Sequence, residues 1–220
     1  MTSVMPKQAA PVVTAAMRTK AQDNIKKAKV QLVLHQPFFA SIILKRKIDI
    51  KDEVQTAYVT ASGHIVCGTA FTAGLTVPEV VFLLAHEAMH YAMLHHMRRS
   101  FRKQKPWNVS CDYVINDILS SSGVGKQIEG TLRKDNAKDF TAEQLYDEQQ
   151  GGGGKGGDQY EPGNGWDDMS DDGLGDIDDA QIEDIKRELI QARTAAKAQG
   201  KMPAALEGLI DSIINPITQI

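Results

Sequence analysis

The chain has 220 residues, 42% of them hydrophobic and 24% charged, and a formal net charge of −3. This length and composition fit one globular domain or two small ones and exclude a collagen-like, coiled-coil or fully disordered protein. No apolar run approaches the roughly 18 residues of a membrane span, and the N-terminus lacks the apolar core of a signal peptide. Two cysteines, Cys67 and Cys111, cannot form a disulfide framework, so we expect a cytoplasmic protein with no membrane partner.

The chain divides by composition into four segments. We expect residues 1–13 to form a flexible N-terminal arm and residues 14–150 to form the main domain. Residues 151–180 are rich in glycine and aspartate and poor in apolar side chains, which is typical of a disordered linker or insertion. Apolar residues at helical spacing return in residues 181–220, and we expect these helices to pack back on the main domain.

The first half of the main domain changes from helical to strand-like patterning. Apolar residues at helical spacing predict a long helix over residues 14–34 and a short buried one over 37–44. Short runs rich in Ile, Val, Tyr and Thr then predict three β-strands, at residues 47–50, 56–60 and 64–67. The third strand either offers a sheet edge along which a peptide adds or lies within the core.

A capping box marks the start of the next helix, where Glu79 follows Thr76 by three residues. We expect this helix to run from Val77 to about Arg102, with a further helix over about 107–120. Many helices with a few short strands predict an α+β fold that is mostly helical and has a small sheet.

The expected helix holds His86, Glu87 and His90 in the pattern H-E-x-x-H. The two histidines are four residues apart, so they project from one helix face and can share a metal ion. Glu87 points about 100° away, which suits a carboxylate that contacts an activated water instead of the ion. Every other residue from Val80 to Leu94 is apolar or tyrosine, and buried ionisable groups need a compensating partner such as Zn²⁺. The alternative is a core helix whose histidines bond to backbone carbonyls.

A catalytic zinc ion usually has a third protein ligand. His95 and His96 would lie about 180° and 80° from His86 around a continuous helix, so we expect neither to affect metal binding. Asp112 in the following helix is the favoured third ligand, although alone it would only complement a helix dipole. Asn116 shares its helix face and is expected to hydrogen-bond to a ligand side chain.

The segments HEAMHYAMLHHMRR and WNVSCDYVIND resemble a bacterial and phage family known as the putative metallopeptidase domain, which often precedes a von Willebrand A-like domain. The resemblance covers most of the chain. It implies a zincin-like fold with an HExxH active-site helix, zinc bound by His86, His90 and Asp112, and Glu87 as the catalytic residue. If the protein is phage-encoded, the expected location is the host cytoplasm. The stretch at 151–179 departs from the family pattern as an insertion.

These observations predict a zinc-dependent metallopeptidase that acts on a protein or peptide substrate, with a metal-activated water and Glu87 as general base. Either Tyr91 or Tyr113 is expected to stabilise the oxyanion. The alternative is a non-catalytic metal-binding or assembly module. A basic run at residues 98–105 could bind nucleic acid, but such runs more often complement a helix C-terminus. Nucleic acid is therefore the less favoured partner.

Overall fold

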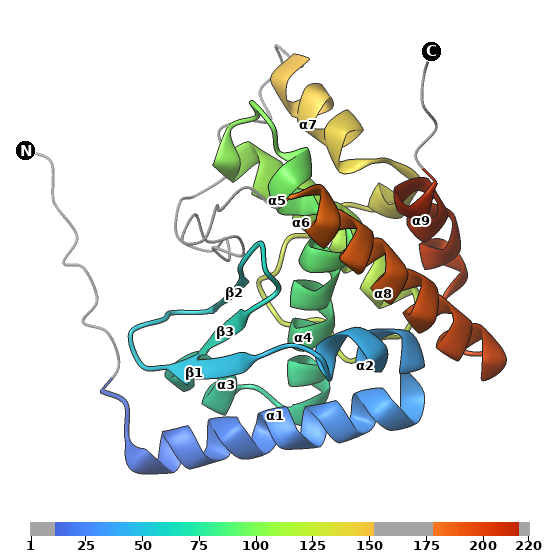
Figure 1. Ribbon diagram of the computed structural model, residues 1–220. Helices are drawn as coiled ribbons and strands as arrows, with labels where there is room; N and C mark the ends of the chain where they lie inside the picture. Colours follow the sequence, from blue (N-terminus) through green and yellow to red (C-terminus); the bar gives the residue numbers. More distant parts are fainter. Residues whose placement is uncertain (1–11, 152–177, 216–220) are drawn as a thin grey trace, which may run out of the picture.

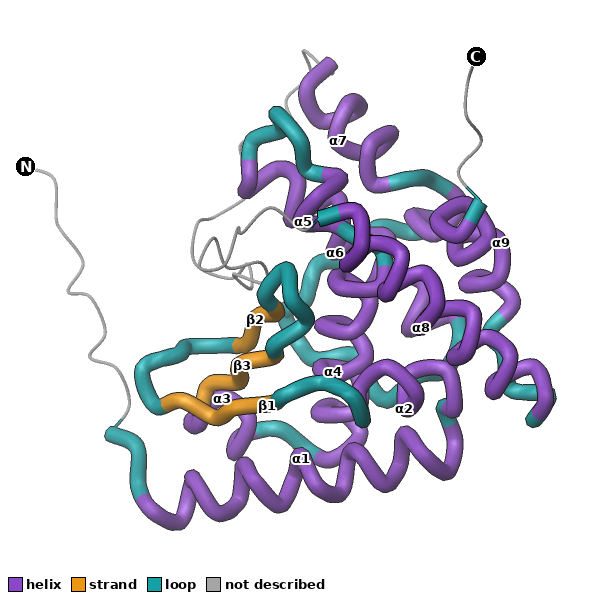
Figure 2. Tube along the Cα trace, viewed as in Figure 1, coloured by secondary structure: helices purple, strands orange, loops and turns teal. Residues whose placement is uncertain are grey.

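The computed structural model describes residues 12–151 and 178–215 (Figure 1). The predicted N-terminal arm and the predicted linker lie almost wholly outside these ranges. Helices dominate the described part of the chain, and one small sheet of three strands accompanies them (Figure 2). The predicted α+β fold, mostly helical with a small sheet, is therefore confirmed at this level.

The described part of the chain begins with two helices, continues with the three strands and ends with further helices. These elements are α1 (Ala15–His35), α2 (Pro37–Ile43), β1 (Ile48–Lys51), β2 (Ala57–Val59), β3 (Ile65–Gly68), α3 (Thr69–Gly74), α4 (Val77–Ala92), α5 (His95–Arg98), α6 (Gln104–Ser121), the 3₁₀ helix η1 (Ala137–Asp139), α7 (Ala142–Gly151), α8 (Asp179–Ala198) and α9 (Ala204–Ile214). Among these helices, none is long and apolar enough to cross a membrane.

Helix α4 begins where the sequence predicts. The Glu79 carboxylate accepts a hydrogen bond from the backbone nitrogen of Thr76 at 2.8 Å and another from its hydroxyl at 2.7 Å. Lys126 donates to the other oxygen of Glu79 at 2.8 Å. These contacts hold the helix start in place, because they pair groups at the helix N-terminus that have no partner within the helix.

Helix α4 ends earlier than the sequence predicts, at Ala92, and the chain turns before α5 begins at His95. The turn occurs at Leu94, whose φ of 54° lies in the left-handed region. A residue in this conformation cannot continue a right-handed helix, and for a leucine it costs about 1–2 kcal/mol. The prediction of one helix over residues 77–102 is therefore wrong, and the sequence has no glycine at this position that would have marked the break.

The three strands form a sheet in the order β1-β3-β2. Strand β1 pairs with β3 in parallel, with Ile48 opposite Ile65, and β2 pairs with β3 antiparallel, with Val59 opposite the same residue. Since β3 is the central strand and all four of its residues are buried, it offers no free edge. Of the two alternatives for this segment, the core strand is correct.

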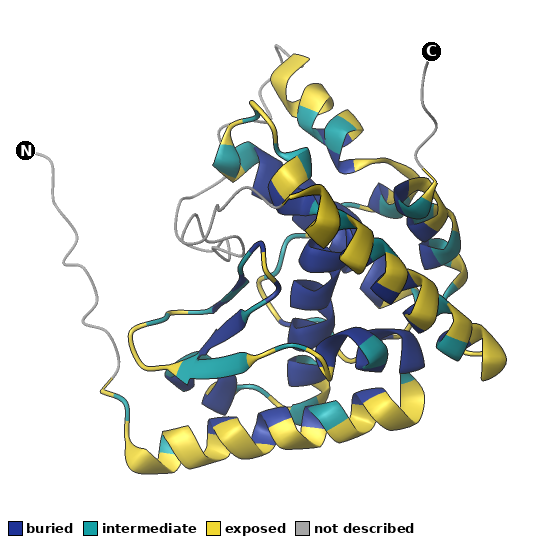
Figure 3. Ribbon diagram, viewed as in Figure 1, coloured by how far each residue is buried: buried dark blue, intermediate teal, exposed yellow. Residues whose placement is uncertain are grey.

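Helix α4 runs through the centre of the molecule, and all its residues from Val80 to Ala92 are buried (Figure 3). It packs against α1, α2, α6 and β2. Helix α1 turns an apolar stripe inward that includes Ala21, Ala28 and Leu32, and the opposite side of α1 faces solvent (Figure 3). Burial of this much apolar surface is the main stabilising contribution, and it places the residues of α4 inside the protein.

Helix α8 lies against α2 and α9 (Figure 1). Ile185 and Leu189 on α8 are buried in the main core. Between them in the sequence, the buried Glu188 accepts two hydrogen bonds from one guanidinium nitrogen of Arg46, at 3.0 and 3.1 Å. The C-terminal part of the chain is thus joined to the N-terminal part by apolar packing and by one buried ion pair.

Candidate metal centre

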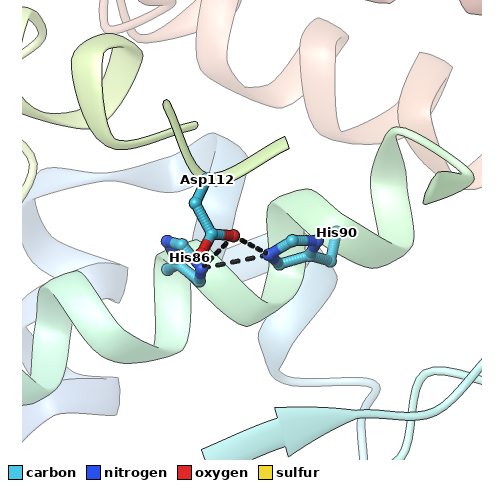
Figure 4. A group of neighbouring side chains, drawn as sticks. All are labelled: His86, His90 and Asp112. Carbon is cyan, nitrogen blue, oxygen red and sulfur yellow. Dashed lines mark hydrogen bonds and ion pairs between the residues drawn. The ribbon is translucent and has the colours of Figure 1, made fainter. Parts of the chain in front are cut away.

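The candidate site lies between helices α4 and α6. Helix α4 supplies His86, Glu87 and His90, and α6 supplies Asp112 and Asn116. All five side chains are buried, with at most 4% of the residue exposed. The structure therefore brings the five sequence-predicted residues together in one place, where His86, His90 and Asp112 point toward one another (Figure 4).

Three atoms of this site converge. The Nε2 atoms of His86 and His90 lie 3.0 Å apart, and Asp112 Oδ1 lies 3.2 Å from Nε2 of His90 and 3.6 Å from Nε2 of His86. With metal–ligand bonds of about 2.0–2.1 Å, two ligand atoms of a tetrahedral zinc ion lie about 3.3 Å apart. The three spacings bracket this value, so these atoms could hold a single ion.

The contact of His86 with Asn116 fixes which nitrogen of its ring carries the proton. Asn116 donates through Nδ2 to the backbone oxygen of Leu132 at 3.1 Å, so its Oδ1 is the atom that faces His86 Nδ1, at 2.9 Å. Because Oδ1 can only accept, Nδ1 of His86 carries the proton. Its Nε2 then presents a lone pair toward the other two atoms, as a metal ligand must.

Asp112 adds a negative charge to the candidate metal centre. Its Oδ1 is buried and has no hydrogen-bond partner among the described residues. Burial alone would raise the pKa of Asp112, but its interactions with His86 and His90 outweigh burial and hold that pKa well below its usual range. Burial lowers the pKa of His90. At neutral pH the site thus holds an ionised carboxylate and a neutral imidazole, the forms that bind metal ions, and this donor set fits a divalent cation.

Glu87 is completely buried beside these residues. Neither of its carboxylate oxygens has a hydrogen-bond partner within the described part of the chain. The pKa of Glu87 is raised to about 8, mainly because the group is buried; the charge of His86 opposes this rise and that of Asp112 adds to it. A buried carboxyl group without a partner is costly, and such perturbed groups cluster at functional sites.

The two histidines after the helix break have different surroundings. Nδ1 of His95 lies 3.1 Å from Nδ1 of His90, whereas Nε2 of His96 lies 3.0 Å from the backbone oxygen of Val59 in β2. The placement of His95 about 180° from His86 is wrong because it assumed a continuous helix, whereas α4 ends at Ala92. The left-handed residue Leu94 changes the direction of the chain and returns the His95 ring to His90.

The two candidate tyrosines also differ. The hydroxyl of Tyr91 donates to Glu188 Oε2 at 3.2 Å, and the guanidinium carbon of Arg46 lies 4.6 Å from the centre of its ring. Tyr91 therefore joins α4 to α8, and its hydroxyl is engaged there. Tyr113 is partly buried against the main core, and its hydroxyl has no hydrogen bond to any described residue, so it is the tyrosine that keeps a free donor.

A mostly helical α+β fold with two histidines from one buried helix and a carboxylate from the next defines a protein with a candidate metal centre. The comparison with protein families agrees with a metal-binding protein. The chain belongs to the family described as a putative metallopeptidase domain, which matches residues 20–219, and the predicted family resemblance is thereby confirmed. Neither curated proteins nor solved structures give a match.

Proposed function

We propose that the protein is a zinc-dependent metallopeptidase with a zincin-like, HExxH-type active site. The observation that carries this proposal is the convergence of three buried ligand atoms from His86, His90 and Asp112 next to an unpartnered Glu87. The family to which the chain belongs supports the same reaction class, and the substrate is accordingly a protein or a peptide.

The donor set favours zinc among the common divalent cations. Two imidazole nitrogens and one carboxylate oxygen match the ligands that zinc takes in peptidases, whereas calcium and magnesium prefer oxygen ligands alone. Within the described residues, only His86, His90 and Asp112 form a group that could hold a metal ion. Three protein ligands leave a fourth position open, which is typical of catalytic and not of structural zinc sites.

Each residue of the site has a separate role in the proposed reaction. Zinc, when bound, supplies a Lewis acid that polarises the scissile carbonyl and activates water at neutral pH. The ionised form of Glu87, which a nearby cation favours, takes the proton of the attacking water and transfers it to the leaving amine. Asn116 orients His86. Tyr113 is the proposed oxyanion stabiliser, because the hydroxyl of Tyr91 is held by Glu188.

The test compares the parent with Glu87→Gln in the zinc-loaded full chain. Both proteins are incubated with a peptide library, with and without a zinc chelator, and cleavage is followed by mass spectrometry. We expect chelator-sensitive cleavage by the parent and a loss on the order of 10²-fold or more in the variant, with the zinc content unchanged. Equal cleavage by the two proteins would remove Glu87 as the base, and zinc binding without cleavage by the parent would favour a non-catalytic metal-binding module.

A further inference from the structure

His90 and His95 face each other through the same ring atom. Their Nδ1 atoms lie 3.1 Å apart, and their ring planes are inclined at 75° with centroids 5.1 Å apart. A hydrogen bond between two imidazole nitrogens needs one protonated nitrogen and one lone pair. A metal ion bound at Nε2 of His90 would require Nε2 to be unprotonated, so in the metal-bound state the proton would lie on Nδ1 of His90 and the lone pair on Nδ1 of His95.

We propose that His95 is a positioning residue of the metal centre, which accepts a hydrogen bond from Nδ1 of His90 and thereby aims Nε2 of His90 at the ion. This inference rests on the proposed function, because it assigns a role at the same zinc site. It adds a residue that contacts neither the ion nor the substrate. His95 acts only through His90.

The surroundings of His95 hold its ring in place. The residue is 2% exposed, and its backbone oxygen accepts a hydrogen bond from Nε1 of Trp107 at 2.9 Å. The ring also packs edge-on against Trp107, with centroids 5.9 Å apart. One tryptophan thus fixes both the backbone and the side chain of His95, so the acceptor is in position before a metal ion arrives.

The left-handed turn before His95 has a function in this scheme. Leu94 adopts a conformation that costs about 1–2 kcal/mol for a residue with a side chain, and Arg98 supports the turn by donating to the backbone oxygen of Met93 at 3.0 Å. Strain of this kind concentrates at functional sites, where surrounding structure maintains it. Here the result of the turn is that a histidine five positions after His90 contacts the ligand ring.

Both ligand histidines are therefore oriented by neutral acceptors, His86 by the Asn116 amide and His90 by the His95 ring. Carboxylates often fill this position in zinc proteins. Two carboxylates, Asp112 and Glu87, are already buried at this site. A third would add repulsion and desolvation cost to the metal-free protein, so a neutral partner suits this centre.

The test uses two variants that are nearly identical in shape. His95→Asn keeps an acceptor close to the position of Nδ1, whereas His95→Leu places a methyl group there. His96→Leu is the control, because His96 is similarly buried but bonds to the backbone of β2. Zinc affinity is measured in the full chain by competition with a chromophoric chelator, and thermal unfolding of the metal-free proteins identifies any variant that fails to fold.

We expect His95→Leu to weaken zinc binding by about 10–100-fold, the effect typical of partners that orient a ligand, and His95→Asn to recover most of the loss. His96→Leu should keep the parent affinity. When all three proteins are loaded with Co²⁺, the visible absorption spectrum of the parent should match that of His95→Asn. It should differ from the spectrum of His95→Leu. Equal zinc affinities of the Leu and Asn variants would overturn the role of His95 while leaving the proposed function intact, and absence of zinc binding by the parent would overturn both.

Discussion

Nδ1 of His86 and Oδ1 of Asn116 lie 2.9 Å apart, and the other end of the Asn116 amide donates to the backbone oxygen of Leu132. This relationship connects the proposed metal ligand His86 on α4 to α6 and to the loop that follows α6. Because Asn116 is held at both ends, it leaves the His86 ring one orientation and one proton position. The geometry of the centre is thus set by side chains that would not themselves touch an ion.

Removal of this hydrogen bond should weaken metal binding without abolishing it. We expect Asn116→Leu to reduce zinc affinity by about 10–100-fold, since His86 would lose the acceptor that selects its tautomer. Asn116→Asp keeps an oxygen that can accept from His86 but loses the donor to Leu132, so its affinity should lie between those of Asn116→Leu and the parent. Competition with a chelator of known affinity measures both variants. Parent-like binding by Asn116→Leu would show that Asn116 does not orient His86.

The raised pKa of Glu87 predicts a pH-dependent stability in the metal-free protein. Burial raises this pKa from 4.5 to about 8, so between these pH values the folded state holds a proton that the unfolded state has released. The stability of the parent should therefore fall as the pH rises through this window, with a slope approaching about 1.4 kcal/mol per pH unit. Glu87→Gln lacks this titration and should be the more stable protein at pH 7.5.

Urea unfolding of parent and Glu87→Gln, carried out from pH 5 to pH 8 in excess chelator, measures this difference. The stability gap should widen with pH and shrink when zinc is added, because a nearby cation favours the ionised carboxylate. A gap that stays constant over this range would contradict the assignment of Glu87 as a buried, unpartnered acid in the metal-free protein.

The amino-acid pattern predicts the parts of the site that depend on local geometry. Two histidines four residues apart share a face in any α-helix, and the capping box at Thr76 fixes where that helix begins. The position proposed for Asp112 required only that the helix after the one with the histidines run back along it. All of these inferences use the regular repeat of a helix.

The remaining features depend on contacts that no local pattern encodes. The left-handed turn at Leu94 has no glycine to mark it, so the contact of His95 with His90 could not be predicted from its spacing. The hydrogen bond from Tyr91 to Glu188 joins residues 97 positions apart. It depends on the packing of α8 against the N-terminal part of the chain.

The buried pair of Arg46 and Glu188 should contribute to the attachment of α8. Their side chains are 15% and 8% exposed, so Glu188→Gln leaves a largely buried guanidinium without its counter-charge. We expect a loss of about 2–3 kcal/mol in the free energy of unfolding, somewhat below the range for fully buried pairs. Glu183→Gln on the same helix breaks an exposed pair with Lys186 and should cost under about 0.5 kcal/mol. Equal effects of the two substitutions in urea unfolding would contradict this role.

Zinc titration of the parent, Asp112→Asn and Asp117→Asn by isothermal calorimetry tests the metal centre most directly. The two variants neutralise carboxylates five positions apart on α6. Asp117 differs in that it accepts a hydrogen bond from the backbone nitrogen of Lys138 at 2.9 Å. We predict one zinc ion per parent chain, parent-like binding by Asp117→Asn, and a loss for Asp112→Asn that exceeds the roughly 10–100-fold typical of an orienting residue. Parent-like binding by Asp112→Asn, or no zinc on the parent, would contradict a centre formed by His86, His90 and Asp112.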